Sequence, residues 1–378
     1  MKLMESVYIT GIGKFLPGPV VPNDEMEAHI GRIHGVPSRV RQAILRRNGI
    51  KGRHYAIDAE GRHFGTNAGM AAEAIRAACG NAHRGVGDLQ YLATSTTQGD
   101  LLVPGFGSTV HAELGTGPME VASFQSVCAS SMMAIRAAYL NLRAGDHHLA
   151  AVSGSEFSSR WFQPGFYEAF VPRETAAEPP ADLEFLRWTL SDGAGALVLE
   201  TAPRSGGTNL RIDWIDIRSF AGEYENCMFA GQAGNKGAAS LPWSHYPSPG
   251  AAYEAGSLAL RQDFKLLHRM FTTWAGFYLA TIEARGVDPA GIDHFLPHYS
   301  AESLGAEMRR LLSETGAMIP EERWFTTLRE TGNVGSASIF LMLDGLAARR
   351  DLAMGQTILC FVPESGRCLA GFMHLTVI

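Results

Sequence analysis

The chain holds a cysteine that is placed to act as a nucleophile. Cys128 lies in the sequence Ser-Val-Cys-Ala-Ser-Ser at residues 126–131, between an apolar strand pattern and the helical pattern of residues 129–143. The positive end of a helix dipole favours a thiolate over a thiol, so we expect an activated sulfur here. Because free cysteines are often ordinary core residues, Cys128 is a candidate only in combination with other residues.

Two later segments supply partners for this cysteine. His298 follows the short apolar run at residues 294–297, and Asn333 lies in Thr-Gly-Asn-Val-Gly before a helix that starts with small residues. Functional groups collect where strands of open α/β sheets end, which favours a role for His298. His294, within the strand, is expected to be structural. Taken singly, His298 could be a structural histidine and Asn333 a helix N-cap.

Short apolar runs alternate with longer helical patterns along the chain, which predicts a layered α/β protein. The second half repeats the plan of the first, and Cys128 and Asn333 each precede a helix start. The sequence therefore predicts an internal duplication, joined near residues 202–208. The expected strands lie at residues 7–10, 89–94, 148–152, 192–200, 210–217, 294–296, 357–362 and 369–377, and the expected helices at 69–79, 129–143, 255–285 and after Ser336.

Together, the segments around Cys128, His298 and Asn333 resemble the ketoacyl-ACP synthase III family of thiolase-fold condensing enzymes, which carries a Cys-His-Asn triad in this order. The resemblance covers nearly the whole chain. It implies two pseudo-duplicated α/β halves in a five-layered αβαβα core, with the halves at residues 1–201 and 208–378. Further matching segments are Asn23-Asp24-Glu25, Asn48-Gly49-Ile50 before Arg53, and the glycine turn at 192–196.

The resemblance implies a 3-oxoacyl-[acyl-carrier-protein] synthase III reaction. Cys128 would take an acyl group from a thioester, and the acyl-enzyme would condense with a malonyl-carrier thioester that loses carbon dioxide, or with a ketoacyl-carrier thioester. His298 and Asn333 would stabilise the enolate. Backbone N–H groups of Cys128, Ser365 and Gly366 are candidate oxyanion donors. The resemblance implies no metal and no permanently bound cofactor; the substrates would be acyl-CoA or acyl-carrier thioesters.

Two segments depart from the family pattern. His298 is followed by Tyr-Ser-Ala in place of Gln-Ala-Asn, and residues 362–367 read Val-Pro-Glu-Ser-Gly-Arg in place of a Gly-Phe-Gly-x-Gly loop. These features are similar to dialkylresorcinol-forming ketosynthases and natural-product acyltransferases. Two alternatives stay open: an acyltransferase in which His298 activates an alcohol or amine, and a non-catalytic partner subunit. The presence of Asn333 favours condensation.

The composition fits a soluble enzyme with local binding surfaces. Of 378 residues, 46% are apolar and 19% charged, and the net charge of −6 argues against general nucleic-acid binding. The five cysteines show no CxxC spacing, which indicates a reducing compartment and no zinc site. Glu5 interrupts the apolar start that a signal peptide needs, and no run is long enough to span a membrane. We therefore expect a cytoplasmic protein.

Two further surfaces are predicted to bind partners. Residues 32–53 contain seven basic side chains and no acidic one, which suits the phosphates of coenzyme A or an acidic acyl carrier protein. Residues 157–190 and 221–254 are rich in aromatics, Pro and Gly and are expected to wall a binding tunnel or a subunit interface. The resemblance implies a homodimer. The basic residues are Arg32, Arg39, Arg41, Arg46, Arg47, Lys51 and Arg53.

Overall fold

A computed structural model describes residues 5–349 and 352–378. Its core is a mixed sheet with the strand order β11-β12-β13-β8-β1-β7-β6-β4-β5. The strands are β1 (Tyr8–Phe15), β4 (Tyr91–Thr96), β5 (Glu120–Gln125), β6 (Leu149–Glu156), β7 (Gly193–Glu200), β8 (Leu210–Ser219), β11 (His294–Pro297), β12 (Thr357–Glu364) and β13 (Leu369–Val377). Two short two-stranded sheets pair β2 (Val21–Pro22) with β3 (Gly52–Arg53) and β9 (Met228–Phe229) with β10 (Arg261–Gln262).

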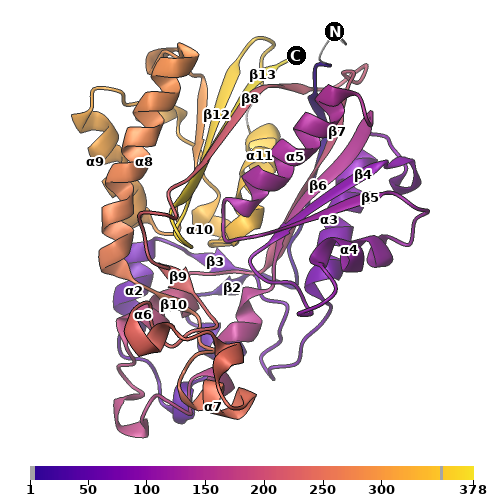
Figure 1. The fold of residues 1–378 in the computed structure, drawn as a ribbon. Helices are drawn as coiled ribbons and strands as arrows, with labels where there is room; N and C mark the ends of the chain where they lie inside the picture. The colour runs from indigo at the N-terminus through magenta and orange to yellow at the C-terminus, as the bar shows by residue number, and fades with distance from the viewer. Residues whose placement is uncertain (1–4, 350–351) are drawn as a thin grey trace.

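Helices cover both faces of the sheet and also fill its middle (Figure 1). The long helices are α3 (Asn67–Asn81), α4 (Phe106–Leu114), α5 (Ser130–Ala144), α8 (Phe264–Arg285), α9 (Glu302–Glu314) and α11 (Ser338–Arg349). The short helices are α1 (Met26–Ile30), α2 (Arg41–Asn48), α6 (Ala181–Arg187), α7 (Pro249–Glu254) and α10 (Leu328–Thr331).

The central layer consists of α5 and α11. One continuous apolar cluster joins Ile135 of α5 and Phe340 of α11 to Val152 of β6 on one side and to Cys360 of β12 on the other. Helices α3 and α4 cover the outer face of the β1–β7 half, and α8 and α9 cover the outer face of the β8–β13 half (Figure 1). The order helix, sheet, helix, sheet, helix is the predicted five-layered core.

The two halves share one strand pattern. In the first half, β4 and β6 are parallel and β6, β7 and β1 are antiparallel neighbours. In the second half, β11 and β12 are parallel and β12, β13 and β8 are antiparallel neighbours. Within the described residues, β1 and β8 are paired at Tyr8 with Arg211 and at Ile9 with Leu210. This repeated pattern agrees with the duplication that the sequence predicts.

The predicted helix over residues 255–285 is wrong in its first part. The structure places a turn at Gly256, whose φ is +75°, and then the short strand β10. Helix α8 begins only at Phe264, where the Asp263 side chain accepts a hydrogen bond from the Leu266 N–H. An Asp N-cap satisfies a free donor of the first turn, which fixes the helix start. Periodicity alone did not reveal this boundary.

The predictions about membranes and leader peptides rest partly on residues 1–4, which lie outside the described residues. Within the part of the chain that the structure describes, no helix is both long enough and apolar enough to cross a bilayer.

Strand β1 lies unusually close to α3. A Cβ added at Gly13 would lie 2.2 Å from the backbone nitrogen of Ala78 and 2.4 Å from the carbonyl oxygen of Ala74. A Cβ at Gly11 would lie 2.3 Å from the Ala78 oxygen. Backbone atoms of a packed helix cannot move aside cheaply, so these glycines set the distance between the sheet and its outer helix.

We therefore expect Gly13→Ala to destabilise the fold by about 1–3 kcal/mol, as overpacking of a core does. The thermal unfolding midpoint, followed by circular dichroism, should fall clearly below that of the wild type. Gly87→Ala is the matched control, because a Cβ there meets nothing within 4 Å. An unchanged midpoint for Gly13→Ala would contradict this account of the β1–α3 contact.

Candidate active site

Cys128 lies at the start of α5, where the sequence places it. The hydroxyl of Ser131 donates to the Cys128 carbonyl oxygen at 2.8 Å, and that of Ser130 donates to the Val127 carbonyl oxygen at 2.7 Å. These two bonds fold the Ser-rich segment back over the turn that carries the sulfur. The N-cap residue of α5, Ala129, has no side chain that can cap the helix.

His298 follows β11 directly. Its backbone N–H donates to the Phe361 carbonyl oxygen at 2.8 Å, so the residue continues the pairing of β11 with β12. The side chain is buried, and burial lowers the pKa of the imidazole to about 4. The ring is therefore neutral near pH 7 and offers one N–H donor. His294 lies inside β11 and is buried there, in agreement with its predicted structural role.

Asn333 is fixed by its backbone and by one side-chain atom. Its N–H donates to the Thr189 carbonyl oxygen at 3.2 Å, and its carbonyl accepts from the Ser191 N–H at 2.9 Å. The side-chain oxygen Oδ1 accepts from the Gly335 N–H at 3.0 Å. Because Oδ1 is engaged in this turn, the amide is oriented, and its NH₂ group remains as a donor toward the cavity that Asn333 lines.

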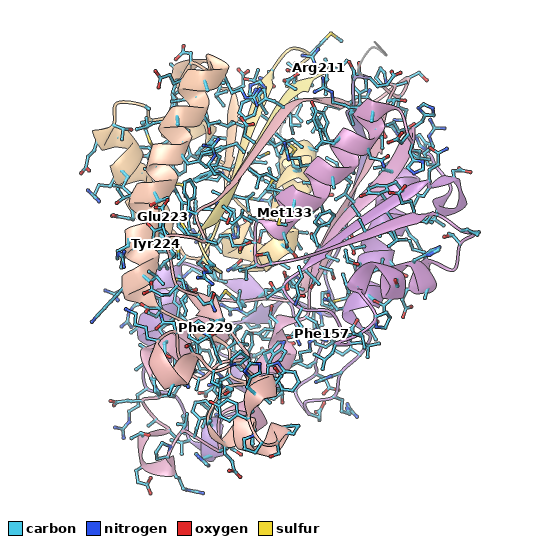
Figure 2. All side chains as sticks on the ribbon, in the orientation of Figure 1. Met133, Phe157, Arg211, Glu223, Tyr224 and Phe229 are labelled. Carbon is cyan, nitrogen blue, oxygen red and sulfur yellow. The ribbon has the colours of Figure 1, made fainter. Side chains whose placement is uncertain are left out.

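Cys128, His298 and Asn333 line one cavity of about 670 Å³. This volume is in the range of small-molecule sites. Both aromatic loops contribute to its wall, as the sequence predicted: Phe157 and Trp161 come from the first, and Phe229 and Trp243 from the second. Figure 2 shows Phe157 and Phe229 in the lower part of the molecule, away from the C-terminus marked in Figure 1. Much of the remaining wall is apolar, with Leu186, Leu190, Leu258, Leu260, Phe271 and Trp274.

Two glutamates that the sequence analysis did not select also line this cavity. Glu156 ends β6 and Glu364 ends β12, and both are almost fully buried. Burial raises the pKa of each carboxyl group to about 7. A signal was present, because Glu364 lies in the segment that departs from the glycine loop of the family, yet that departure indicated only a similarity to dialkylresorcinol-forming ketosynthases and natural-product acyltransferases.

Each glutamate binds the helix start that belongs to the other half. Oε1 of Glu156 accepts from the Ser336 N–H at 3.1 Å, just before α11. Oε2 of Glu364 accepts from the Ala129 N–H at 3.1 Å, at the start of α5. A carboxylate at a helix N-terminus satisfies free donors and is favoured by the helix dipole. These bonds supply the caps that the local side chains lack.

The expected activation of the Cys128 sulfur by the helix dipole is opposed by the surroundings of the thiol. Burial raises the pKa of the Cys128 thiol well above its usual range, and the nearby carboxyl groups of Glu364 and Glu156 raise it further. The helix dipole is outweighed because a buried anion loses its hydration, and two acidic neighbours disfavour a third negative charge. The sulfur is therefore a thiol in the resting protein.

The candidate oxyanion donors in the Ser365-Gly366 turn border the same cavity as Cys128. The Ser365 carbonyl accepts from the Met228 N–H at 2.9 Å, and the Gly366 carbonyl accepts from the Cys227 N–H at 2.8 Å. These bonds tie the turn to β9. An oxyanion role for the N–H groups of Cys128, Ser365 and Gly366 stays a prediction.

Comparisons with known proteins agree with this geometry. The family described as 3-oxoacyl-[acyl-carrier-protein (ACP)] synthase III C terminal matches residues 282–371. The β-ketoacyl-[acyl-carrier-protein] synthase III of Cereibacter sphaeroides is 28% identical over 353 residues, and that of Hyphomonas neptunium 26% over 357 residues, each covering 93% of both chains. Over nearly its whole length, the chain is similar to β-ketoacyl-[acyl-carrier-protein] synthases III.

Solved structures with the same fold cover almost the whole chain. AbyA1, a tetronic acid condensing enzyme, superimposes with a TM-score of 0.77 at 23% identity and covers 98% of this chain and 99% of its own. OleA of Xanthomonas campestris gives a TM-score of 0.72 at 19% identity, with 99% and 100% covered. The synthase III of Pseudomonas aeruginosa gives 0.71 at 19%, with 98% of each chain covered. The predicted thiolase-like fold is confirmed.

The basic segment at residues 32–53 is only partly a free surface. Arg53 is fully buried, and its Nη1 donates to the Asn23 Oδ1 at 2.8 Å, so it was wrongly assigned to a docking surface. Arg32 and Arg41 both pair with Glu27, at 3.2 and 3.1 Å. Acidic residues outside the segment thus neutralise part of it, which a count within residues 32–53 could not show. Exposed positions remain at Arg46, Arg47 and Lys51.

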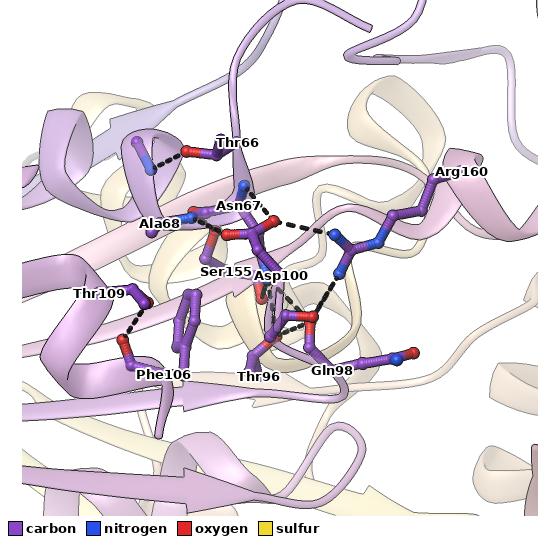
Figure 3. A network of polar contacts seen from close by, with 12 residues as sticks. Thr66, Asn67, Ala68, Thr96, Gln98, Asp100, Phe106, Thr109, Ser155 and Arg160 are labelled. Atoms are coloured by element: carbon purple, nitrogen blue, oxygen red, sulfur yellow. Dashed lines mark hydrogen bonds and ion pairs between the residues drawn. The ribbon is translucent and has the colours of Figure 1, made fainter. Parts of the chain in front are cut away.

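One basic side chain in the cavity wall is already engaged (Figure 3). Nη1 of Arg160 pairs with Asp100 at 2.9 Å, and Nη2 donates to the Gln98 and Gly99 carbonyl oxygens, both at 2.9 Å. The Asp100 carboxylate also accepts from the N–H groups of Asn67 and Ala68 at the start of α3. Arg160 therefore fixes the loop after β4 and has little capacity left for an anionic ligand.

We expect Glu364→Gln to increase the rate at which Cys128 is alkylated. Removing a negative charge next to the thiol lowers the pKa of that thiol, so at pH 8.5 the rate with iodoacetamide should rise about three- to tenfold. At pH 6 the native Glu364, whose pKa is about 7, is mostly protonated, and the two proteins should react alike. Peptide mapping, with Cys128→Ser as the control, identifies the labelled cysteine. A slower rate at pH 8.5 would refute this electrostatic account.

Proposed function

We propose that Cys128 accepts an acyl group from an acyl-CoA or acyl-carrier thioester and that the acyl-enzyme then condenses with a second, carrier-bound thioester. The observation that carries this proposal is the convergence of Cys128, His298 and Asn333 on one buried, largely apolar cavity. An apolar wall suits an acyl chain, and the three polar groups suit the thioester chemistry.

The roles follow from the chemistry of each group. The Cys128 sulfur attacks the acyl carbonyl and a coenzyme A or carrier thiol leaves, so one thioester replaces another. The second thioester becomes a nucleophilic enolate, whose oxygen accepts hydrogen bonds from the neutral imidazole of His298 and the amide NH₂ of Asn333. The enolate carbon joins the acyl carbon, and the bond to sulfur breaks.

We expect His298→Ala and Asn333→Ala to retain self-acylation and to lose condensation. Each variant lacks one donor to the enolate, which costs about 100- to 1,000-fold in rate. Intact-protein mass spectrometry after addition of acyl-CoAs of several lengths measures the adduct, and analysis of small-molecule products measures condensation. Cys128→Ala is the control that should form no adduct.

The outcomes separate the candidate functions. No adduct on the wild type would refute the catalytic role of Cys128 and favour a non-catalytic partner subunit. An adduct that only alcohols or amines discharge would favour the acyltransferase alternative. An adduct discharged equally well by both alanine variants would remove His298 and Asn333 from the condensation step.

We further propose a homodimer in the cytoplasm, with the chain divided into halves at residues 1–201 and 208–378. Support for the dimer comes from strand β5, which lies at the end of the sheet with one edge unpaired within the described residues. Close to it, Leu102 and Val103 are 76% and 81% exposed. An open strand edge beside exposed apolar side chains is a common place for a second copy to bind.

Val103→Asp should then convert a dimer into a monomer, because a buried unpaired charge would oppose association. Analytical ultracentrifugation of both proteins at the same concentration tests this. Met354→Asp is the matched control, since Met354 is 84% exposed and lies in the turn before β12. A wild-type monomer, or a dimer that persists in Val103→Asp, would contradict the proposed interface.

A further inference from the structure

The cavity holds two buried carboxyl groups without a cationic partner. Glu156 and Glu364 are 3% and 2% exposed, and within the described residues no basic side chain lies at ion-pair distance from either one. Of the two arginines in the wall, Arg160 pairs with Asp100, and Arg367 is exposed, with its Nε donating to the Tyr224 carbonyl oxygen. The neutral His298 adds no positive charge. The interior of the site is therefore acidic.

The two carboxyl groups differ in how many hydrogen bonds they already accept. Glu156 accepts from the hydroxyl and N–H of Ser336 and from the hydroxyl and N–H of Thr97. Glu364 accepts on Oε1 from the Ser126 hydroxyl at 2.5 Å and on Oε2 from the Ala129 N–H at 3.1 Å, with a further contribution from the Val127 N–H. A carboxylate has about four acceptor positions, two on each oxygen, so Glu364 keeps a free position. On Glu156 the four donors bind Oε1, and Oε2 shares only the Thr97 N–H, at 3.3 Å.

Glu364 also lies next to the nucleophile. Its two oxygens bind Ser126 and Ala129, which flank Cys128 in the chain. Of the two carboxyl groups, Glu364 has the larger effect on the Cys128 thiol. The second substrate must bring its α-carbon to the acyl group on the Cys128 sulfur. The α-carbon of the second substrate must therefore lie close to Glu364 when it reacts.

These charges bear on which second substrate the site accepts. A malonyl group carries a carboxylate, which two acidic neighbours repel, and it forms its enolate by losing carbon dioxide, which requires no base. A β-ketoacyl thioester is neutral at its reacting end, but its α-carbon must lose a proton. An acidic interior with a free carboxylate beside Cys128 therefore suits a β-ketoacyl thioester and opposes a malonyl thioester.

We propose that Glu364 is the general base that removes an α-proton from a neutral β-ketoacyl thioester, so that condensation proceeds without loss of carbon dioxide. The inference rests on the proposed function. The α-proton moves to the Glu364 carboxylate, and the C–H electron pair forms an enolate held by His298 and Asn333. The enolate carbon bonds to the acyl carbon, the bond to the Cys128 sulfur breaks, and protonated Glu364 returns the proton to that sulfur.

The test begins with acyl-enzyme prepared from octanoyl-CoA and freed of excess thioester. Acetoacetyl-CoA and malonyl-CoA are then added separately, and loss of the adduct is followed by intact mass together with the carbon dioxide released. We expect acetoacetyl-CoA to discharge the wild-type adduct at least tenfold faster than malonyl-CoA and without carbon dioxide. Malonyl-CoA discharging faster, or acetoacetyl-CoA failing to discharge the adduct, would overturn the proposal without any variant.

Glu364→Gln keeps the size of the side chain and loses the base. Its acyl-enzyme should react with acetoacetyl-CoA about 100-fold more slowly than the wild type. Glu314→Gln, which removes an exposed carboxylate at the end of α9, is the control and should react at the wild-type rate. If Glu364→Gln reacts with acetoacetyl-CoA at the wild-type rate, Glu364 is not the base and serves only to cap the start of α5. Failure of the wild type to form any octanoyl adduct is a different result, which refutes the proposed function itself.

A pH profile separates the two carboxyl groups. The titratable and charged groups near Glu364 are Cys128, Glu156, His298, Cys368 and the exposed Arg367. The Cys128 sulfur is acylated in this experiment and does not titrate, and burial raises the pKa of Cys368 to about 12. Discharge by acetoacetyl-CoA should rise with pH through about 7 in the wild type and in Glu156→Gln, and the rise should vanish in Glu364→Gln. A rise that vanishes in Glu156→Gln and persists in Glu364→Gln would transfer the role to Glu156 and overturn the assignment.

Discussion

The site depends on a reciprocal exchange of carboxylates between the two halves of the molecule. Glu156, at the end of β6 in the first half, caps the segment before α11, and Glu364, at the end of β12 in the second half, caps the start of α5. Each half therefore supplies the anion that holds the other half's helix start. Cys128 and the segment that carries Asn333 are therefore held in place by contacts between the two halves.

This exchange has a consequence for the chemistry. A capping carboxylate stabilises a helix start, but here it also lies beside a buried thiol, whose pKa it raises. The dipole of α5 favours a thiolate, whereas desolvation and two acidic neighbours oppose it, and the opposing effects win. Formation of the thiolate is therefore disfavoured in the resting protein. The resting protein does not store a pre-formed nucleophile.

The sequence was sufficient for the layered fold and for Cys128, His298 and Asn333, because strand ends and small-residue helix starts are local patterns. It was not sufficient for Arg53, whose neighbours Asn23 and Trp188 come from distant segments that bury it. It also did not select Glu156 or Glu364. Their importance comes from helix starts more than 150 residues away, and no local pattern marks such a contact.

The duplication explains why the two glutamates correspond, and their hydrogen bonds explain why they are unequal. β6 and β12 occupy the same place in the two halves, so their terminal carboxylates meet in one cavity. The donors differ between the two halves: Ser336 and Thr97 bind Oε1 of Glu156, whereas Glu364 binds Ser126 and Ala129, which lie on either side of Cys128 in the chain. Because only Glu364 binds the residues next to Cys128, the same structural element can hold the site together in one half and move a proton in the other.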